Sequence, residues 1–159
     1  MARDAAVAVL LQLLDEAFDR KAWHGTNLRG SVRGLEVRRA AWRPGPGRHS
    51  AWELMVHAAY WKYAVRRQIT GEKRGSFPER GSNWFPRQAE AGEAAWRRDV
   101  LLLVDQHRKL RATVAALRGS DLARKPQGSR YRIGTLVRGV ASHDLYHAGQ
   151  IQLLKRLGA

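Results

Sequence analysis

Two histidines near the C-terminal end of the chain, His143 and His147, have the spacing of a metal-binding pair. Residues four positions apart on a helix lie on one face, about one turn apart, so both imidazoles would point to the same place. The pair shares an apolar stripe with Val140 and Leu154, where ring nitrogens would find no water to hydrogen-bond. A divalent metal ion satisfies such nitrogens directly. The spacing and the stripe therefore predict a metal site.

A third histidine, His57, follows the same pattern in another segment. It lies on a stripe with Leu54 and Trp61 rather than among the charged residues of that segment. A lone histidine on an apolar face is usually a hydrogen-bonded core residue. Together with the pair His143 and His147, it favours a site of three histidines on two helices. A core of hydrogen-bonded histidines without metal is the alternative interpretation.

The chain contains no cysteine, which excludes disulfides and thiolate metal ligands. A metal would therefore be held by histidine and oxygen ligands alone. Three protein nitrogens leave at least one coordination position for water or substrate, which is typical of a catalytic rather than a structural metal. Imidazole ligands suit Zn, Ni, Fe and Mn ions, so the sequence does not choose among these metals.

Two further residues are candidates for a catalytic role. Gln150 continues the inward stripe one step beyond His147, where it would orient a water molecule or a substrate carbonyl, or hydrogen-bond within the core. His24 follows the first predicted helix and would shuttle a proton or bind substrate if that end of the helix faces the metal. An ordinary loop histidine is the alternative for His24.

Three more polar residues have competing interpretations. Asp144 would hold an imidazole N–H beside the metal or be a surface charge. His107, on a predicted helical stripe, would be a core residue or a fourth ligand. Glu53 would be a general base or ligand, but with Ser50 it also forms the capping-box pattern that begins a helix.

Hydrophobic periodicity predicts four main helices, which must position these residues, and no strands. Glycine and proline mark the connections, among them a long loop that its aromatic residues would pin to the helices. We expect one all-α domain over residues 1–159, a four-helix bundle with long inter-helix loops. The predicted helices cover residues 3–23, 50–70, 89–117 and 135–157, a short helix is expected within 28–35, and the long loop covers 71–88.

The net charge of +15, from 29 Lys and Arg against 14 Asp and Glu, raises the question of an anionic partner. A strongly basic surface attracts nucleic acid or acidic small molecules. The basic residues are scattered and form no known nucleic-acid motif. We therefore prefer a solvated surface with an anionic small-molecule substrate and keep nucleic acid as the alternative.

Targeting and membrane signals are missing from the sequence. No run of eighteen apolar residues occurs, so we expect no membrane-spanning segment. The first residues lack the apolar core and the cleavage site of a signal peptide, which leads us to expect a cytoplasmic protein.

Three segments resemble the DinB-like (DinB/YfiT) superfamily. They are His-Asp-Leu-Tyr-His-Ala-Gly-Gln-Ile at 143–151, His-Ser-Ala-Trp-Glu-Leu-Met-Val-His-Ala-Ala-Tyr-Trp at 49–61 and Trp-His-Gly at 23–25. The resemblance spans about residues 3–157, and its C-terminal segment is the most specific. It implies a four-helix bundle in which His57, His143 and His147 hold a divalent metal. It also implies pairing of two copies, so we expect a homodimer.

The resemblance leaves the reaction open, because a fold does not fix a function. Some similar proteins are thiol S-transferases that use bacillithiol or glutathione, or mycothiol-dependent enzymes, in which the metal activates an external thiol. We therefore expect a metal-dependent transferase of this kind, with a low-molecular-weight thiol as cosubstrate, or a metal-dependent hydrolase. The alternative is a non-enzymatic, stress-related helical bundle that binds a structural metal or associates with nucleic acid.

Overall fold

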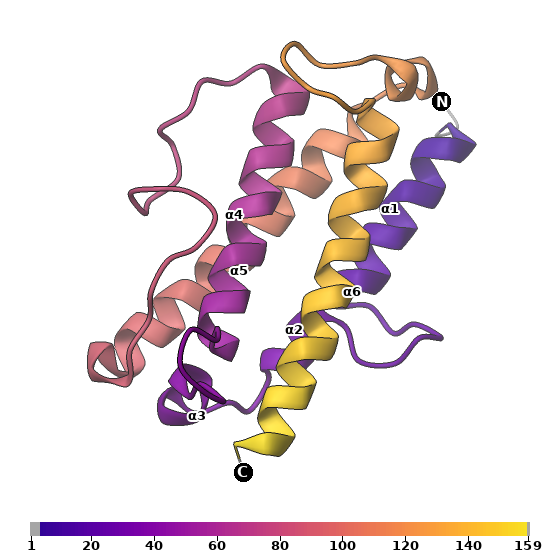
Figure 1. Ribbon diagram of the computed structural model, residues 1–159. Helices are drawn as coiled ribbons and strands as arrows, with labels where there is room; N and C mark the ends of the chain where they lie inside the picture. Colours follow the sequence, from indigo (N-terminus) through magenta and orange to yellow (C-terminus); the bar gives the residue numbers. More distant parts are fainter. Residues whose placement is uncertain (1–3, 159) are drawn as a thin grey trace.

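The computed structural model describes residues 4–158, and every regular element in that range is a helix. The predicted all-helical class is therefore confirmed (Figure 1). None of the described helices has the length and apolarity that crossing a membrane requires. The long helices are α1 (Ala5–Phe18), α4 (Ala51–Thr70), α5 (Gly92–Ala115) and α6 (Ile133–Leu157); the short ones are α2 (Leu28–Val32), α3 (Val37–Ala41) and the 3₁₀ turns η1 (Ala89–Ala91) and η2 (Gly119–Ala123).

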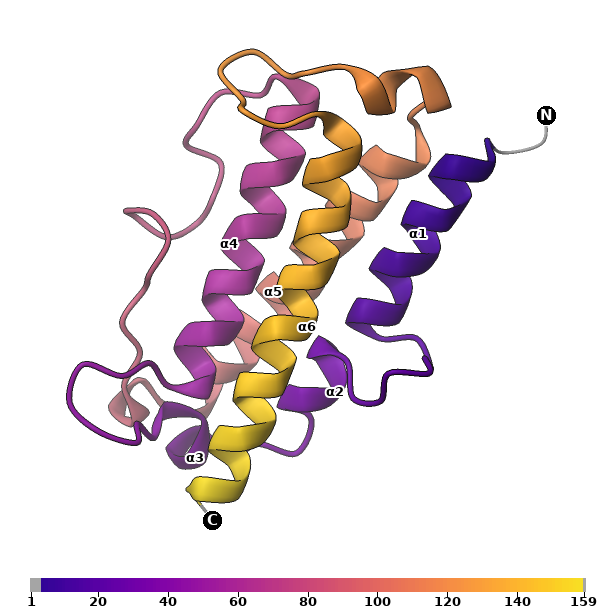
Figure 2. The ribbon, with the colours of Figure 1, turned by 45° about the vertical axis from the view of Figure 1, so that its right-hand side comes forward.

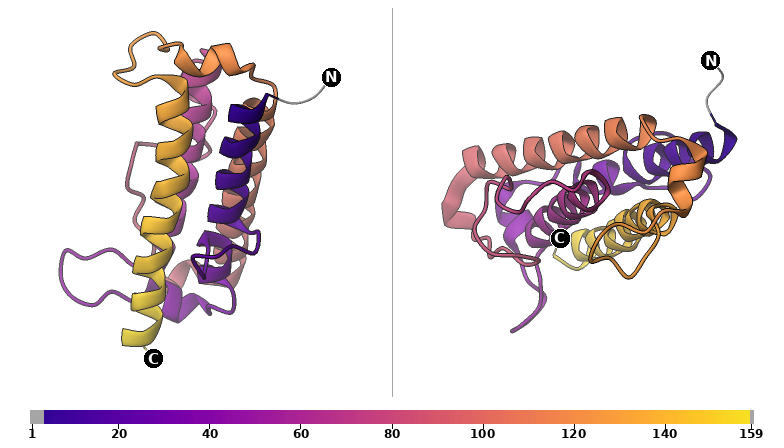
Figure 3. Two further views of the ribbon diagram at one scale, coloured as in Figure 1. Left: turned by 90° about the vertical axis from the view of Figure 1, so that its right-hand side faces the viewer. Right: turned by 90° about the horizontal axis from the view of Figure 1, so that it is seen from above.

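The four long helices lie side by side, and each contacts two others. Helix α4 packs against α5 and α6, and α1 packs against the same two helices from another side (Figure 3). The short helices α2 and α3 lie near the end of the molecule where α6 finishes (Figure 2). Helices α4 and α6 thus run next to each other in opposite directions, which brings together residues that are distant in the sequence.

Helix α4 begins and ends at the residues that the sequence indicates. The Ser50 hydroxyl accepts a hydrogen bond from the Glu53 backbone N–H at 3.2 Å, and the Glu53 carboxylate accepts one from the Ser50 backbone N–H at 3.0 Å. This capping box satisfies N–H groups that the first turn leaves without partners. Gly71 closes the helix with φ +76°, a left-handed conformation that glycine adopts without strain.

Buried apolar side chains form two clusters, and both include residues of α4 and of α6. The first surrounds the start of α4 and includes Trp52, Met55, Phe85, Trp96 and Leu103. The second lies among α1, α4, α5 and α6 and includes Leu14, Ile69, Leu110, Ile133 and Val137. Both clusters hold α4 and α6 at fixed positions, which is what a site shared by these two helices requires.

Two predicted helices differ from the structure, and one observed helix was not predicted. The first helix ends at Phe18 rather than at residue 23, because the apolar stripe stops there and charged residues and the fully exposed Trp23 follow. Its predicted start at residue 3 lies outside the described residues. The predicted helix 89–117 is divided into η1 and α5, since Gly92 has φ +80°. Helix α3 lies in a stretch for which no helix was predicted.

The loop 71–88 is pinned by its aromatic residues, as predicted. Phe77 and Phe85 are buried. The Phe77 ring packs against the rings of Tyr60 and Tyr63 with centroids 5.4 Å apart in both pairs, and Phe85 packs against Tyr60 at 5.5 Å. The loop therefore covers one side of α4 and brings residues 83 and 84 close to His57.

Candidate metal centre

His57 of α4 and His143 and His147 of α6 come together where the two helices meet. The His143 Nε2 atom lies 3.1 Å from the His57 Nε2 and 3.0 Å from the His147 Nε2. One ring nitrogen of each histidine lies within 4.8 Å of those of the other two. His57 and His147 are buried and His143 is half-buried. The structure thus brings together the three histidines that the sequence singled out.

These distances suit three ligands of one ion. Nitrogens at 2.0–2.1 Å from a tetrahedral metal ion lie about 3.3 Å apart, and a less open angle at the metal brings them closer. The observed separations of 3.0 and 3.1 Å are near this value. A three-nitrogen cluster of this size is compatible with metal binding.

Hydrogen bonds to the other ring nitrogens orient two of the imidazoles. The Nδ1–H of His57 donates to the carbonyl oxygen of Asn83 at 2.7 Å. The Nδ1–H of His147 donates to the side-chain oxygen of Gln150 at 2.6 Å. Each neutral ring then has an unprotonated Nε2, so the lone pairs of both atoms face His143. Outer partners of this kind fix the tautomer of histidines that bind metals.

Hydrogen bonding within the cluster does not satisfy all three rings. If His143 carries its proton on Nε2, it donates that proton chiefly to one neighbour and leaves the other lone pair without a full hydrogen bond. The Nδ1 atom of His143 is buried and has no hydrogen-bond partner among the described residues. A metal ion would accept all three Nε2 lone pairs, which a single proton shared among the rings does not. It would leave the His143 Nδ1–H without a partner as well, so the Nδ1 atom does not distinguish the two interpretations.

The surroundings keep these histidines neutral. Burial lowers the pKa of His57 to about 4 and that of His143 to about 3, and nearby histidines add to both shifts. Burial also lowers the pKa of His147, against the opposing effect of its hydrogen bond to Gln150. Since a metal binds the deprotonated imidazole, neutral rings at pH 7 are ready to act as ligands.

The loop 71–88 forms one wall of the site. The Trp84 ring stacks on His57 with centroids 3.9 Å apart, and its stack with His49 has a centroid distance of 3.5 Å. The Asn83 side-chain oxygen accepts a hydrogen bond from the Trp61 indole N–H at 2.9 Å. Asn83 has φ +71°, and asparagine tolerates this left-handed conformation better than most residues. Sequence reasoning missed Asn83, for which an asparagine in a loop was only a weak signal.

Asp144 does not hold an imidazole of the cluster. Its carboxylate, fully buried, forms an ion pair with Lys62 of α4, which is also fully buried. The Lys62 ammonium lies 3.3 Å from the Nδ1 of His107, and the His107 ring stacks on Phe18 at 3.7 Å. His107 is therefore a core residue outside the three-histidine group. Sequence reasoning did not identify Lys62 as a buried residue.

The remaining candidates have different positions. Gln150 contacts His147, as described above, and is half-buried. His24 is exposed and lies beside Ser142 and Arg138 in a hollow between α1 and α6, with no recorded contact to the three histidines. Glu53 serves the capping box and pairs with Arg43 at 2.5 Å. The structure thus brings only Gln150 of these to the histidine cluster.

The comparisons with known proteins agree with the sequence resemblance. A protein-family profile described as the DinB superfamily matches residues 20–151, a range that includes His57, His143 and His147. No curated protein and no solved structure matches the chain. Because the profile covers most of the sequence, the chain belongs to the DinB superfamily.

Proposed function

We propose that this DinB-superfamily protein binds a divalent transition metal through His57, His143 and His147 and catalyses a transferase or hydrolase reaction there. The thiol S-transferase-like reaction is the preferred form. The observation that carries the proposal is the convergence of three neutral imidazoles, with Nε2 atoms 3.0 and 3.1 Å apart. Membership in the superfamily and the compatible donor set support it.

A divalent ion at such a site supplies Lewis acidity, which lowers the pKa of a water molecule or of an external thiol toward neutrality. The chain has no cysteine, so a thiol nucleophile must come from a cosubstrate. Asn83 and Gln150 keep two imidazoles in place, and Trp84 covers the face of His57. His143 borders a cavity between α4 and α6, which gives a small molecule access to the cluster.

A thiol panel tests the reaction. Metal-loaded protein is incubated with bacillithiol, mycothiol or glutathione and a model electrophile such as monochlorobimane, and a small ester tests hydrolysis. We expect turnover that requires metal and falls about 100-fold or more in His143→Ala, as for loss of a group central to catalysis. His24→Ala, at an exposed histidine away from the cluster, is the matched control. Equal rates with and without metal would contradict the proposal.

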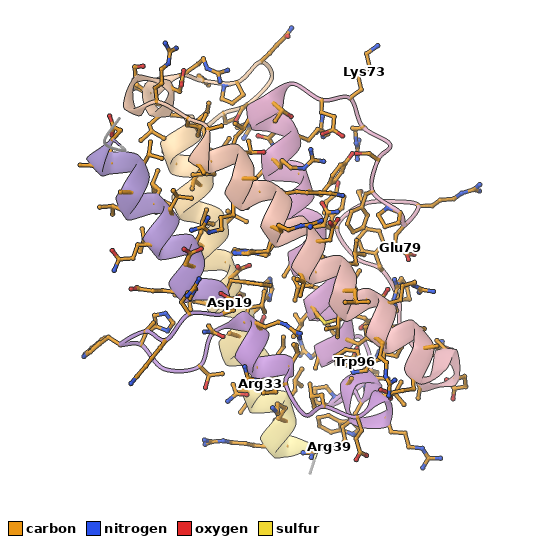
Figure 4. All side chains as sticks on the ribbon, turned by 180° about the vertical axis from the view of Figure 1, so that it is seen from behind. Asp19, Arg33, Arg39, Lys73, Glu79 and Trp96 are labelled. Carbon is orange, nitrogen blue, oxygen red and sulfur yellow. The ribbon has the colours of Figure 1, made fainter. Side chains whose placement is uncertain are left out.

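The net charge of +15 is the one observation that favours a non-enzymatic, nucleic-acid-associated role. The labelled basic residues lie at opposite ends of the molecule, Lys73 at one end and Arg33 and Arg39 at the other (Figure 4). Along the sequence, the Lys and Arg residues are scattered and form no known nucleic-acid motif. Salt-sensitive binding to random duplex DNA would favour this role, and no binding at moderate salt would eliminate it.

We also infer that α1, α4, α5 and α6 form the four-helix bundle that the superfamily resemblance implies, and we expect a cytoplasmic homodimer. Tyr146, Leu153 and Leu157 of α6 are apolar and more than half exposed, which offers a surface for a second copy. Sedimentation velocity of the purified protein measures the oligomeric state, and a monomer at high concentration would contradict the dimer.

A further inference from the structure

A groove with a volume of about 420 Å³ lies between α4 and α6 and reaches His143. Trp61, Val65 and Gln68 line it from successive turns of α4, and its α6 wall runs from Thr135 to His143. Eight residues of helix span about 12 Å, so the groove is elongated along the two helices. Its volume is in the range of small-molecule sites, about 300–1,000 Å³.

The two ends of the groove differ in chemistry. The loop 128–131 closes the end that lies far from His143, and Figure 1 shows this connection in orange above α4 and α6. Arg130 in that loop is the charged side chain among the described lining residues, apart from His143 if it is protonated. The middle of the groove is apolar and is formed by Trp61, Val65, Leu136 and Val140.

Gly139 keeps the middle of the groove open. Glycine destabilises the interior of a helix, yet Gly139 lies in the second turn of α6 and lines the groove. A Cβ atom added there would meet nothing within 4 Å. Packing therefore does not require glycine at this position, and any larger side chain would project into open space on the groove wall.

We propose that this groove binds the apolar body of an elongated small-molecule substrate, whose reacting group lies at His143 and whose far end is an anion at Arg130. The inference rests on the proposed function, because the reacting group meets the three-histidine site. The order of the lining residues carries it: a metal-ligating histidine, then an apolar wall, then a cation. The net charge of +15 also favours an anionic ligand.

Hydroxamic acids test the inference, because the hydroxamate group chelates divalent metals while its chain can be varied. Dissociation constants are measured by calorimetry on zinc-loaded protein with acetohydroxamate, octanohydroxamate and suberic acid monohydroxamate. Each methylene of the ligand that becomes buried should raise the binding affinity by a factor of about four. We expect octanohydroxamate to bind about 50-fold or more tightly than acetohydroxamate, which corresponds to burial of about half of its additional methylenes. The terminal carboxylate of suberic acid monohydroxamate should raise the affinity about threefold over that of octanohydroxamate, and Arg130→Gln should remove this gain.

Two glycines on α6 provide matched variants. Gly139→Leu fills the groove and should abolish the advantage of the long chain over acetohydroxamate. Gly149→Leu introduces the same side chain on the same helix outside the groove, where a Cβ also meets nothing within 4 Å. It should behave as the unmodified protein. Thr135→Phe, at an exposed position on the groove wall, is a second blocking variant if Gly139→Leu does not fold.

The outcomes separate this inference from the proposed function. Zinc uptake is measured first by elemental analysis, and a protein that takes up no zinc contradicts the metal site itself. If the protein takes up zinc but binds all three hydroxamates with equal affinity, the groove assignment is overturned and the metal site stays intact. A chain-length advantage that persists in both Gly139→Leu and Thr135→Phe would also overturn it. Loss of the advantage in these variants but not in Gly149→Leu supports the inference.

Discussion

Lys62 and Asp144 form an ion pair with both side chains fully buried between α4 and α6. The pair lies five residues after His57 and directly after His143, so it joins the two helices that carry the candidate ligands. Burial raises the pKa of Asp144 to about 6, against the opposing effect of the Lys62 charge. The carboxylate is therefore ionised at neutral pH and depends on Lys62 for its charge partner.

Removing only one member of this pair should destabilise the folded protein. Lys62→Met leaves the Asp144 carboxylate buried without a cation, and we expect a loss of about 3–5 kcal/mol in the free energy of unfolding at pH 7. The double variant Lys62→Met/Asp144→Leu should recover most of this loss, because apolar side chains of similar volume need no charge partner. Urea denaturation gives the free energy of unfolding of the single and the double variant. Equal stabilities of the single and double variants would show that the pair does not behave as a buried charge pair.

Gln150 should support metal affinity through His147. Gln150→Leu removes the acceptor for the His147 Nδ1–H, and we expect the metal dissociation constant to rise about 10- to 100-fold. Gln150→Glu retains an acceptor oxygen and should bind metal nearly as tightly as the unmodified protein. Gln152→Leu is the control, since Gln152 lies on the same helix and donates to Thr26 instead. Competition titration with a chelator gives the constants, and similar affinities for Gln150→Leu and Gln152→Leu would refute this role.

Asn83 should stabilise the loop 71–88 through its backbone conformation as well as its side chain. Asn83→Gly loses the hydrogen bond to Trp61 but adopts the positive φ freely and keeps the carbonyl that His57 uses. Asn83→Ala loses the same bond and adds left-handed strain, so we expect it to be about 1 kcal/mol less stable than Asn83→Gly. Thermal and urea unfolding measure the stability of each of the two variants. An alanine variant as stable as the glycine variant would contradict the strain argument.

His107 should make the metal-free protein sensitive to acid. Burial, with the Lys62 and Arg111 charges, lowers its pKa from 6.5 to about 2. The unfolded chain therefore binds a proton below pH 6.5 that the folded protein excludes, so the stability due to neutral His107 is present above pH 6.5 and is lost as the pH falls toward 2. Between pH 7 and pH 5 this amounts to about 2 kcal/mol.

His107→Gln should remove the part of the acid sensitivity that His107 contributes, while His57, His143 and His147, whose pKa values are also lowered, keep theirs. Urea denaturation of the metal-free proteins at pH 7 and pH 5 should show a smaller loss of stability for His107→Gln than for the unmodified protein. His24→Gln, at an exposed position, should keep the full loss. If all three proteins lose the same amount, His107 does not titrate as its burial requires.

The sequence predicted those parts of the fold and site that depend on local periodicity. The stripes around His57 and around His143 and His147 identified the ligand helices, and Ser50 with Glu53 marked the start of α4. Lys62 could not be recognised, because its neighbours Trp61 and Tyr63 do not reveal that α4 is covered on nearly every side. The Lys62 ammonium lies against Asp144 of α6, His107 of α5 and Phe18 of α1, so its burial comes from contacts with the other long helices.

Other parts depended on tertiary contacts in the same way. A catalytic role of His24 required that the end of the first helix face the metal, with an ordinary loop histidine as the alternative. Helix α1 ends at Phe18, and His24 is not in the three-histidine group. The role of Asn83 depends on a loop conformation that sequence patterns do not specify. Gly139 offered no signal either, because the groove that it lines exists only when α4 and α6 are packed together.

Metal content is the most direct test of the three-histidine site. Protein purified without an affinity tag is analysed for transition metals before and after reconstitution, beside His147→Ala and His24→Ala. We expect one divalent ion per chain in the unmodified protein and in His24→Ala, and none in His147→Ala. Less than roughly a tenth of an equivalent of every transition metal, with none taken up on reconstitution, would contradict the site.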